Sequence, residues 1–299
     1  MRLAHLSDPH LLSLAGTRLR DFVNKRWIGA LNLLANRARE HKVEVFDAMV
    51  ADINALGVDH VLCTGDITNV ALPSEFEFAR GRFDRLDFGA ADATIIPGNH
   101  DAYVHAGVPL FADYFGDNFA CDPGWEWPDR DPWPTVRVRG DVAIVGVTTS
   151  LETPWFTAWG RLGAKQIGRL AQVLDDDRLA GTFKLVAIHH PPVGPKAEHD
   201  RHGLKDHRQF CRVVASAGAD LVVHGHEHLD MRNELRGRNG TRIPVHGIQS
   251  ATYAGLRRKH RAHYRVYTLG PGVLTHELRA WNPDAGRFES ATHCPQDPP

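Results

Sequence analysis

The chain has 299 residues, of which 42% are hydrophobic and 24% charged, and its net charge is −1. This composition is typical of globular proteins, and the near-neutral charge gives no overall attraction to a nucleic acid polymer or a membrane. The N-terminal sequence MRLAHLSDPHLL is too polar for a signal peptide, and no apolar run approaches the ~18–20 residues of a spanning helix. The four cysteines form no CxxC pair, which excludes a zinc ribbon or thioredoxin motif. We therefore expect a cytoplasmic protein with reduced thiols.

Short apolar segments recur along the chain, and each ends at a polar cluster. They read as buried strands at residues 2–7, 59–63, 93–96, 142–147, 183–188 and 219–223. Apolar residues at helical spacing lie between them, at residues 43–56, 74–86, 164–174 and 206–216. Residues 243–278 are rich in strand patterns, which suggests a mixed sheet or a second sheet. Alternating strands and helices predict an α/β fold with its site at the carboxyl ends of strands.

The domain organisation follows from the absence of interruptions in the sequence. We find no linker, internal repeat or low-complexity tract, so a single domain over residues 1–293 is the simplest organisation. Residues 294–299 are expected to form a frayed tail.

The polar clusters after five of these strands carry Asp, Asn and His and little else that binds metal. Side chains at i and i+2 of an extended segment point the same way, so Asp8 and His10 can reach one metal, as can His226 and His228. Nitrogen and oxygen ligands without thiolate suit Fe, Mn, Zn, Co or Ni, and we expect Fe, Mn or Zn. The clusters are DPH at 8–10, GDITN at 65–69, GNHD at 98–101, HHPP at 189–192 and GHEH at 225–228.

The order of these five motifs resembles that of the calcineurin-like metallophosphoesterases. Any one motif is weak, but five in order, each after a predicted strand, are strong. In layout the chain is most similar to the bacterial class III phosphodiesterases that cleave cyclic nucleotides or glycerophosphodiesters. The resemblance implies a four-layer αββα sandwich of two mixed β-sheets, with two metal ions along one edge.

The resemblance also implies the ligands of each ion. One ion takes Asp8, His10 and His228, the other takes Asn99, His189 and His226, and Asp66 bridges the two. Because His190 directly follows His189, the sequence alone leaves the ligand of HHPP ambiguous, and the family pattern places it at His189.

Four further residues have expected roles beside the ligands. In the family the histidine at His100 faces the substrate, where it stabilises charge or protonates the leaving group. We expect Asp101 to hold the other ring nitrogen of His100 and so to fix its tautomer. Asn69 and His190 are candidates for substrate binding.

The function implied is a dinuclear metal-dependent phosphodiesterase that attacks a small-molecule phosphate ester with a hydroxide held between the metals. Phosphomonoesterase activity is the alternative, since the same centre can do both. A lipid-nucleotide pyrophosphatase at a membrane surface is a second alternative, but those enzymes carry Arg where this chain has His100. A scaffold without catalysis is disfavoured because every ligand position is filled.

Residues 17–42 form an expected insertion between the first motif and the next helix. The segment has an apolar helical stripe, and its other face carries seven basic and two acidic residues, a balance of +5. It is either a surface helix packed on the domain or a cap over the cleft whose basic face attracts phosphate. Its stripe could also dock on a partner, including a second copy of the chain in a homodimer, or on anionic lipid.

Overall fold

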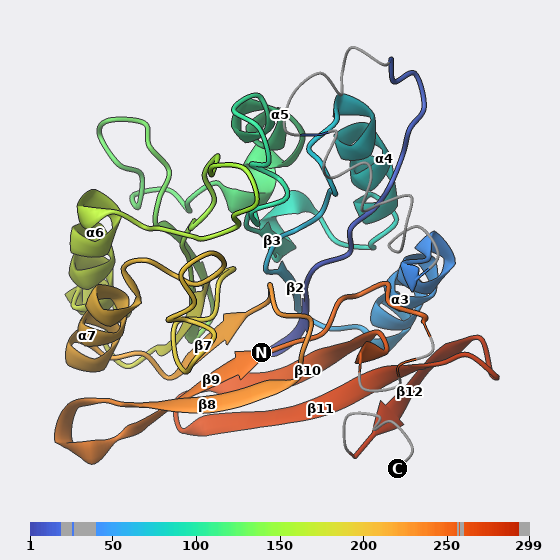
Figure 1. The fold of residues 1–299 in the computed structure, drawn as a ribbon. Helices are drawn as coiled ribbons and strands as arrows, with labels where there is room; N and C mark the ends of the chain where they lie inside the picture. Colours follow the sequence, from blue (N-terminus) through green and yellow to red (C-terminus); the bar gives the residue numbers. More distant parts are fainter. Residues whose placement is uncertain (19–25, 27–39, 256, 258–259, 293–299) are drawn as a thin grey trace.

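The computed structural model describes residues 1–18, 26, 40–255, 257 and 260–292, and Figure 1 shows the arrangement of their elements. The first of two six-stranded sheets has the strand order β12-β11-β10-β1-β2-β3. Strands β1, β2 and β3 run parallel to one another, whereas β10, β11 and β12 are antiparallel, so the sheet is mixed. The bounds are β1 (Arg2–Leu6), β2 (His60–Cys63), β3 (Ala93–Ile95), β10 (His263–Gly270), β11 (Val273–Asn282) and β12 (Arg287–Ala291).

The second sheet has the order β4-β5-β6-β7-β9-β8 and is also mixed. Strands β5, β6, β7 and β9 are parallel, and an antiparallel strand closes each edge. The bounds are β4 (Thr135–Arg139), β5 (Val142–Gly146), β6 (Phe183–Ala187), β7 (Leu221–His224), β8 (Met231–Arg236) and β9 (Arg242–Gly247).

Helices cover the outer faces of the two sheets and complete the four expected layers (Figure 1). One core lies between the first sheet and the helices α3 (Val43–Leu56), α4 (Pro73–Phe83) and α5 (Gly107–Phe119). A second lies between the other sheet and the helices α6 (Ala164–Leu174) and α7 (His207–Ala217), and a third lies between the sheets. The predicted α/β sandwich of two mixed sheets is therefore confirmed.

The alternation of side chains along β7 shows how the sequence builds these layers. Leu221 and Val223 pack between the sheets, while Val222 points to the core beneath α6 and α7. Successive side chains of a strand face opposite sides, so three consecutive apolar residues fill two cores. A strand of this kind has no polar face, which is why it reads as an uninterrupted apolar run.

The four predicted helices are confirmed, two with their predicted bounds, but the sequence missed α5. Gly107, Pro109 and Gly116 lie within α5 and weaken its helical pattern. Its apolar side chains, among them Phe111 and Phe115, nevertheless pack into the core of the first sheet. Burial of these rings therefore outweighs the poor helix propensity of the segment.

Most of the basic insertion at 17–42 lies outside the described residues. Its expected roles as a cap, a membrane contact or a homodimer contact therefore stay predictions, as does the single domain over 1–293. Arg26 is described, and it is buried, with its guanidinium donating to the carbonyls of Val70 and Ala71. The sequence had led us to expect Arg26 on the exposed basic face of the insertion. Because its side chain is buried, Arg26 is not part of such a face. Among the helices of the described ranges, none combines the length and hydropathy needed to cross a bilayer.

Candidate metal centre

The five polar clusters meet where strands of both sheets end. Backbone hydrogen bonds hold the first two together, because the N–H of Asp8 donates to the Gly65 carbonyl at 2.9 Å and that of His10 donates to the Asp66 carbonyl at 3.0 Å. The two loops therefore have fixed positions relative to each other before any side chain is considered.

Two groups of side chains converge in this region with the spacing of metal sites. Within each group, the possible ligand atoms all lie within 4.8 Å of one another. Asn99 adjoins the second group, because its Oδ1 lies 2.8 Å from His226 Nδ1 and 3.1 Å from His189 Nε2. The first group is Asp8, His10 and His228, and the second is Asp66, His189 and His226.

Backbone carbonyls fix which ring nitrogen of three of these histidines carries the proton. A carbonyl only accepts, so the ring nitrogen that contacts it donates and the other nitrogen keeps its lone pair. The contacts join His10 Nδ1 to Thr68 O at 3.1 Å, His189 Nδ1 to Thr64 O at 2.7 Å, and His226 Nε2 to His202 O at 3.0 Å.

The other ring nitrogens of these three histidines lie close to further ring nitrogens. His10 Nε2 lies 3.1 Å from His228 Nε2, and His189 Nε2 lies 3.3 Å from His226 Nδ1. His189 Nε2 and His226 Nδ1 both keep their lone pairs when neutral, and these repel each other unless a positive charge, a metal ion or a proton, lies between them. The nitrogen and oxygen donors therefore fit a pair of transition-metal ions.

The charges of the second group also favour a cation. Burial alone raises the pKa of a carboxyl, but His189 and His100 hold the pKa of Asp66 well below its usual range. Burial likewise opposes protonation of His189, yet the Asp66 carboxylate, 3.5 Å away, raises the pKa of that ring to about 9. The buried carboxylate thus draws positive charge to the point where the ligand atoms meet.

The backbone at these positions is not extended. Of the nine non-glycine residues with positive φ in the described chain, five belong to the two groups: Asp8, His10, Asp66, His226 and His228. Such residues occupy the left-handed region at an energetic cost, and they cluster at functional sites. We expected Asp8 and His10 to share one metal because their side chains would point the same way along an extended strand. That reason was wrong, because both residues lie beyond β1 in a tight loop. It was also wrong for His226 and His228, which belong to different groups.

Two glycines allow the loops to approach one another. A Cβ at Gly225 would collide with the Asp8 carboxylate, and one at Gly98 would collide with the Asp66 carboxylate. The glycines of GHEH and GNHD are thus required for space at this site.

The ring of His100 lines the cleft, but Asp101 does not hold it. His100 Nδ1 contacts the carbonyl of Asn69, and Tyr103 stacks on the ring with centroids 5.7 Å apart. The Asp101 carboxylate instead accepts the N–H groups of Gly98 at 2.9 Å and Thr68 at 2.9 Å, among others. The expected role of Asp101 is therefore corrected, because a carboxylate surrounded by backbone donors joins two loops.

The two candidates for substrate binding lie beneath the cleft. Asn69 is 2% exposed, and its Nδ2 donates to the His10 carbonyl at 2.9 Å. His190 is fully buried, with Nδ1 2.7 Å from Thr149 Oγ1 and Nε2 donating to the Ala158 carbonyl at 3.0 Å. Because their polar atoms hold the loops, neither position supports the expected contact with substrate.

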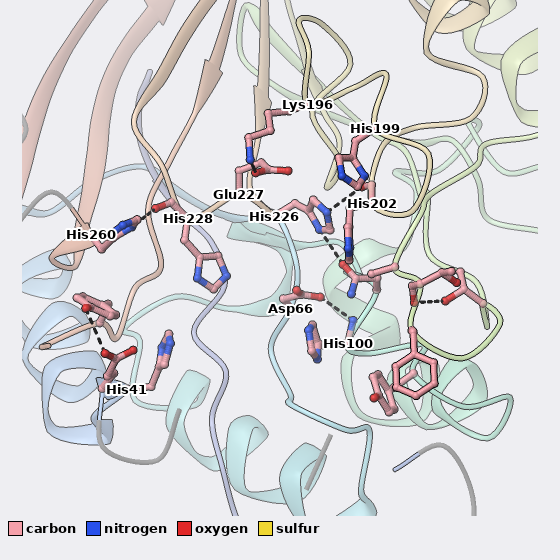
Figure 2. Close-up of a pocket in the computed structure, with 18 of the residues that line it drawn as sticks. His41, Asp66, His100, Lys196, His199, His202, His226, Glu227, His228 and His260 are labelled. Carbon is pink, nitrogen blue, oxygen red and sulfur yellow. Dashed lines mark hydrogen bonds and ion pairs between the residues drawn. The ribbon is translucent and has the colours of Figure 1, made fainter. Parts of the chain in front are cut away.

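A cleft of about 740 Å3 opens over the two groups (Figure 2). Sequence reasoning missed several of its lining residues, among them His199 and His202. The signal available was their place in the loop after HHPP, since loops beside a site often carry specificity. Other lining residues that it missed are His41, Tyr103, Phe156, Lys196, Arg257 and His260.

The sequence matches the calcineurin-like phosphoesterase family over residues 1–230. The chain belongs to that family. No protein among the curated sequences matches it. As a calcineurin-like phosphoesterase the protein is a hydrolase of phosphoric esters that uses two divalent metal ions, and its two Asp and His groups are suited to hold them.

Solved structures share the fold of this calcineurin-like phosphoesterase at low sequence identity. A dimetal phosphatase from Danio rerio is 13% identical, with a TM-score of 0.60 over 93% of this chain and 94% of that one. A purple acid phosphatase from yellow lupin seeds is 12% identical with a TM-score of 0.60, and the NAD nucleotidase of Haemophilus influenzae is 13% identical with a TM-score of 0.50. The matches cover 97% and 98% of this chain, which spans about half of each of these two longer chains, 52% and 54%.

Proposed function

We propose that this calcineurin-like phosphoesterase is a phosphodiesterase for small-molecule esters, of the cyclic-nucleotide or glycerophosphodiester kind. The observation that carries the proposal is the position of the two groups of candidate metal ligands within the cleft. In Figure 2, His41 and His260 lie to one side of His228, whereas His199 and His202 lie to the other side. A cleft that extends both ways from the reacting centre has room for the two organic groups of a diester.

The charge of the cleft supports the same proposal. A diester carries one negative charge, whereas a monoester at neutral pH approaches two and gains more from extra cations. Lys196 lines the cleft, but its Nζ lies 2.6 Å from a carboxylate oxygen of Glu227, which offsets its charge. Because of this ion pair, the part of the cleft beside Lys196 is better suited to a singly charged phosphate.

We assign the metal ligands according to the two groups. When bound, the ions supply an activated water and positive charge for the phosphate oxygens. In this assignment Asp66 is shared, one ion is held by Asp8, His10 and His228, and the other by Asn99, His189 and His226.

His100 is the proposed acid of the reaction. The Asn69 carbonyl accepts from Nδ1, and Tyr103 covers one face, so the ring plane is set. In the protonated ring, Nε2–H can donate to the departing oxygen or to a phosphate oxygen. The Asp66 carboxylate accepts the His100 backbone N–H at 2.7 Å, which holds this residue beside the candidate metal ligands.

A substrate panel with the metal-loaded protein tests the proposal. We expect a higher kcat/KM for bis(p-nitrophenyl) phosphate than for p-nitrophenyl phosphate, and hydrolysis of cyclic nucleotides or glycerophosphodiesters. A clear preference for the monoester in the same assay would overturn the diester proposal.

Phosphomonoesterase activity is the second candidate. The zebrafish and lupin structures that share the fold are described as phosphatases, which favours it. Arg257 also lines the cleft, and its positive charge would favour a dianion. The same panel decides between the two activities.

A further inference from the structure

Phe156 is an apolar ring that lies open to solvent inside a polar cleft. It is 67% exposed and is the most exposed of the large hydrophobic side chains in the described ranges. The others are Leu14, Val108, Trp155 and Val273, and within the described chain Phe156 alone of the five lines the cleft. An exposed apolar ring gains little stabilisation from burial, so packing does not account for the position of this ring in the cleft.

The backbone of Phe156 adds a second cost. Its φ is +62°, in the left-handed region that glycine or asparagine usually occupies. The residue lies in a turn closed by a hydrogen bond from the Thr157 N–H to the Pro154 carbonyl at 3.2 Å. A positive φ at the third residue is the feature of a type II turn, where glycine is favoured. The chain thus places phenylalanine where glycine would be easier to accommodate.

Side-chain hydrogen bonds hold this turn in one conformation. Thr157 Oγ1 donates to the Pro154 carbonyl at 2.7 Å, and Thr153 Oγ1 donates to the Thr157 carbonyl at 2.7 Å. The conformation of Phe156 is therefore fixed by its neighbours on both sides, which is how strained residues persist in folded proteins.

Hydrogen bonds anchor this turn beside the second group of candidate metal ligands. The Ala158 carbonyl accepts from His190 Nε2 at 3.0 Å, and the His190 ring lies 4.2 Å from that of His226 between centroids. The Ala158 N–H donates to the Arg201 carbonyl at 2.8 Å. Phe156 is thus two residues from a position fixed against the side of the centre formed by Asn99, His189 and His226.

We propose that Phe156 determines specificity by stacking on a planar aromatic group of the substrate. The preferred esters would then carry a nucleobase or an aryl group on the phosphate. This inference rests on the proposed hydrolysis of small-molecule phosphate esters and names their class. An aromatic ring stacks on any planar π system, and it contributes binding even when it is exposed before the ligand arrives.

The test compares two esters that differ only in the base: the methyl ester of adenosine 5′-phosphate and the methyl ester of ribose 5-phosphate. We expect the metal-loaded wild type to favour the adenosine ester in kcat/KM, on the order of 5- to 100-fold, mainly through KM. Phe156→Gly should bring the ratio near one, and Phe156→Trp should preserve it. Trp155→Ala is the matched control from the same turn and should also preserve the preference.

Thermal unfolding separates this role from a structural one. Phe156→Gly should leave the melting temperature unchanged or raise it, because glycine accommodates the positive φ. A marked fall in melting temperature would show instead that the ring supports the fold. An unchanged substrate ratio in Phe156→Gly, or no preference in the wild type, would overturn the inference.

Two further measurements distinguish the possible failures. Hydrolysis of bis(p-nitrophenyl) phosphate without an adenine preference would leave the proposed function standing and remove only the inference about Phe156. If no ester is hydrolysed, calorimetric binding of adenosine 5′-phosphate and ribose 5-phosphate to the wild type and Phe156→Gly decides the inference by itself. Inhibition constants of phenylphosphonate and methylphosphonate show whether an aryl group suffices or a nucleobase is required.

Discussion

The backbone N–H of His226 donates to both oxygens of the Asp8 carboxylate, at 3.2 and 3.0 Å. Asp8 follows β1 of one sheet and His226 follows β7 of the other, so this contact joins the edges of the two sheets. The orientation of a residue in the first ligand group is thereby set by the loop that carries a residue of the second. A change at either group is therefore expected to alter both.

The first prediction concerns the carboxylate between the groups. Asp66→Asn should lower the metal content and reduce turnover to background, because it removes a buried negative charge that lies 3.5 Å from His189 Nε2 and 3.9 Å from His10 Nε2. Elemental analysis of the purified variant, beside its activity on bis(p-nitrophenyl) phosphate, measures both effects. The exposed Asp113→Asn on α5 is the control and should change neither. Two tightly bound ions with full activity in Asp66→Asn would refute the assignment.

The second prediction separates chemistry from metal binding at His100. His100→Ala should retain both ions, because the ring belongs to neither ligand group, while kcat falls by roughly 10²–10⁴. The loss should be smaller for esters with good leaving groups, which need less protonation. The exposed His105→Ala should behave as the wild type. An equal loss for every leaving group would make His100 an electrostatic or binding residue instead of an acid.

The fold and the convergence of the candidate ligands were predictable from sequence because both depend on local patterns. Strands that are buried on both faces appear as apolar runs, and the short polar motifs that end them lie at the carboxyl edge of the sheet. The pairing of the ligands came from the family resemblance. The physical argument for it failed, because the positive φ values at Asp8 and His10 cannot be read from their spacing.

The roles of Asp101 and His190 could not be predicted, because they depend on contacts between distant segments. Asp101 accepts hydrogen bonds from the loop after β2, and His190 contacts Thr149 and Ala158 after β5. Nothing in GNHD or HHPP distinguishes a side chain that faces the cleft from one that faces the loops beneath it.

The third prediction follows from the corrected role of Asp101. In Asp101→Asn an amide NH2 would face backbone donors, so the free energy of unfolding of the chelator-treated protein should fall by about 2 kcal/mol or more. Chemical denaturation measures this loss, with His100→Ala as the comparison that should keep its stability. If Asp101→Asn instead lowered kcat as His100→Ala does while leaving stability intact, Asp101 would act through the ring of His100.

The fourth prediction concerns pH and the buried His60. Burial, reinforced by Arg139 and Arg137, lowers the pKa of His60 to about 3 in the folded chain, against 6.5 for an ordinary histidine. The unfolded chain therefore binds one more proton between these values. The stability associated with neutral His60 is fully present above pH 6.5 and is lost as the pH falls toward 3.

Replacing this ring should remove its share of the pH dependence. As the pH falls from about 6 to 4, the free energy of unfolding of His60→Gln should decrease by about 1.4 kcal/mol less per pH unit than that of the wild type. Denaturation curves at several pH values measure the difference between the two proteins. Parallel pH profiles would show that His60 is not neutral in the fold. The exposed His105→Gln is the matched control, whose profile should follow the wild type.

The number of metal ions bound per chain tests the central claim most directly. We predict that elemental analysis of the purified, metal-reconstituted protein finds two ions per chain, that a chelator abolishes ester hydrolysis, and that adding back Mn, Fe or Zn restores it. The two groups of convergent donors account for both ions. A single ion per chain at full activity, or hydrolysis that persists after complete removal of metal, would contradict the account.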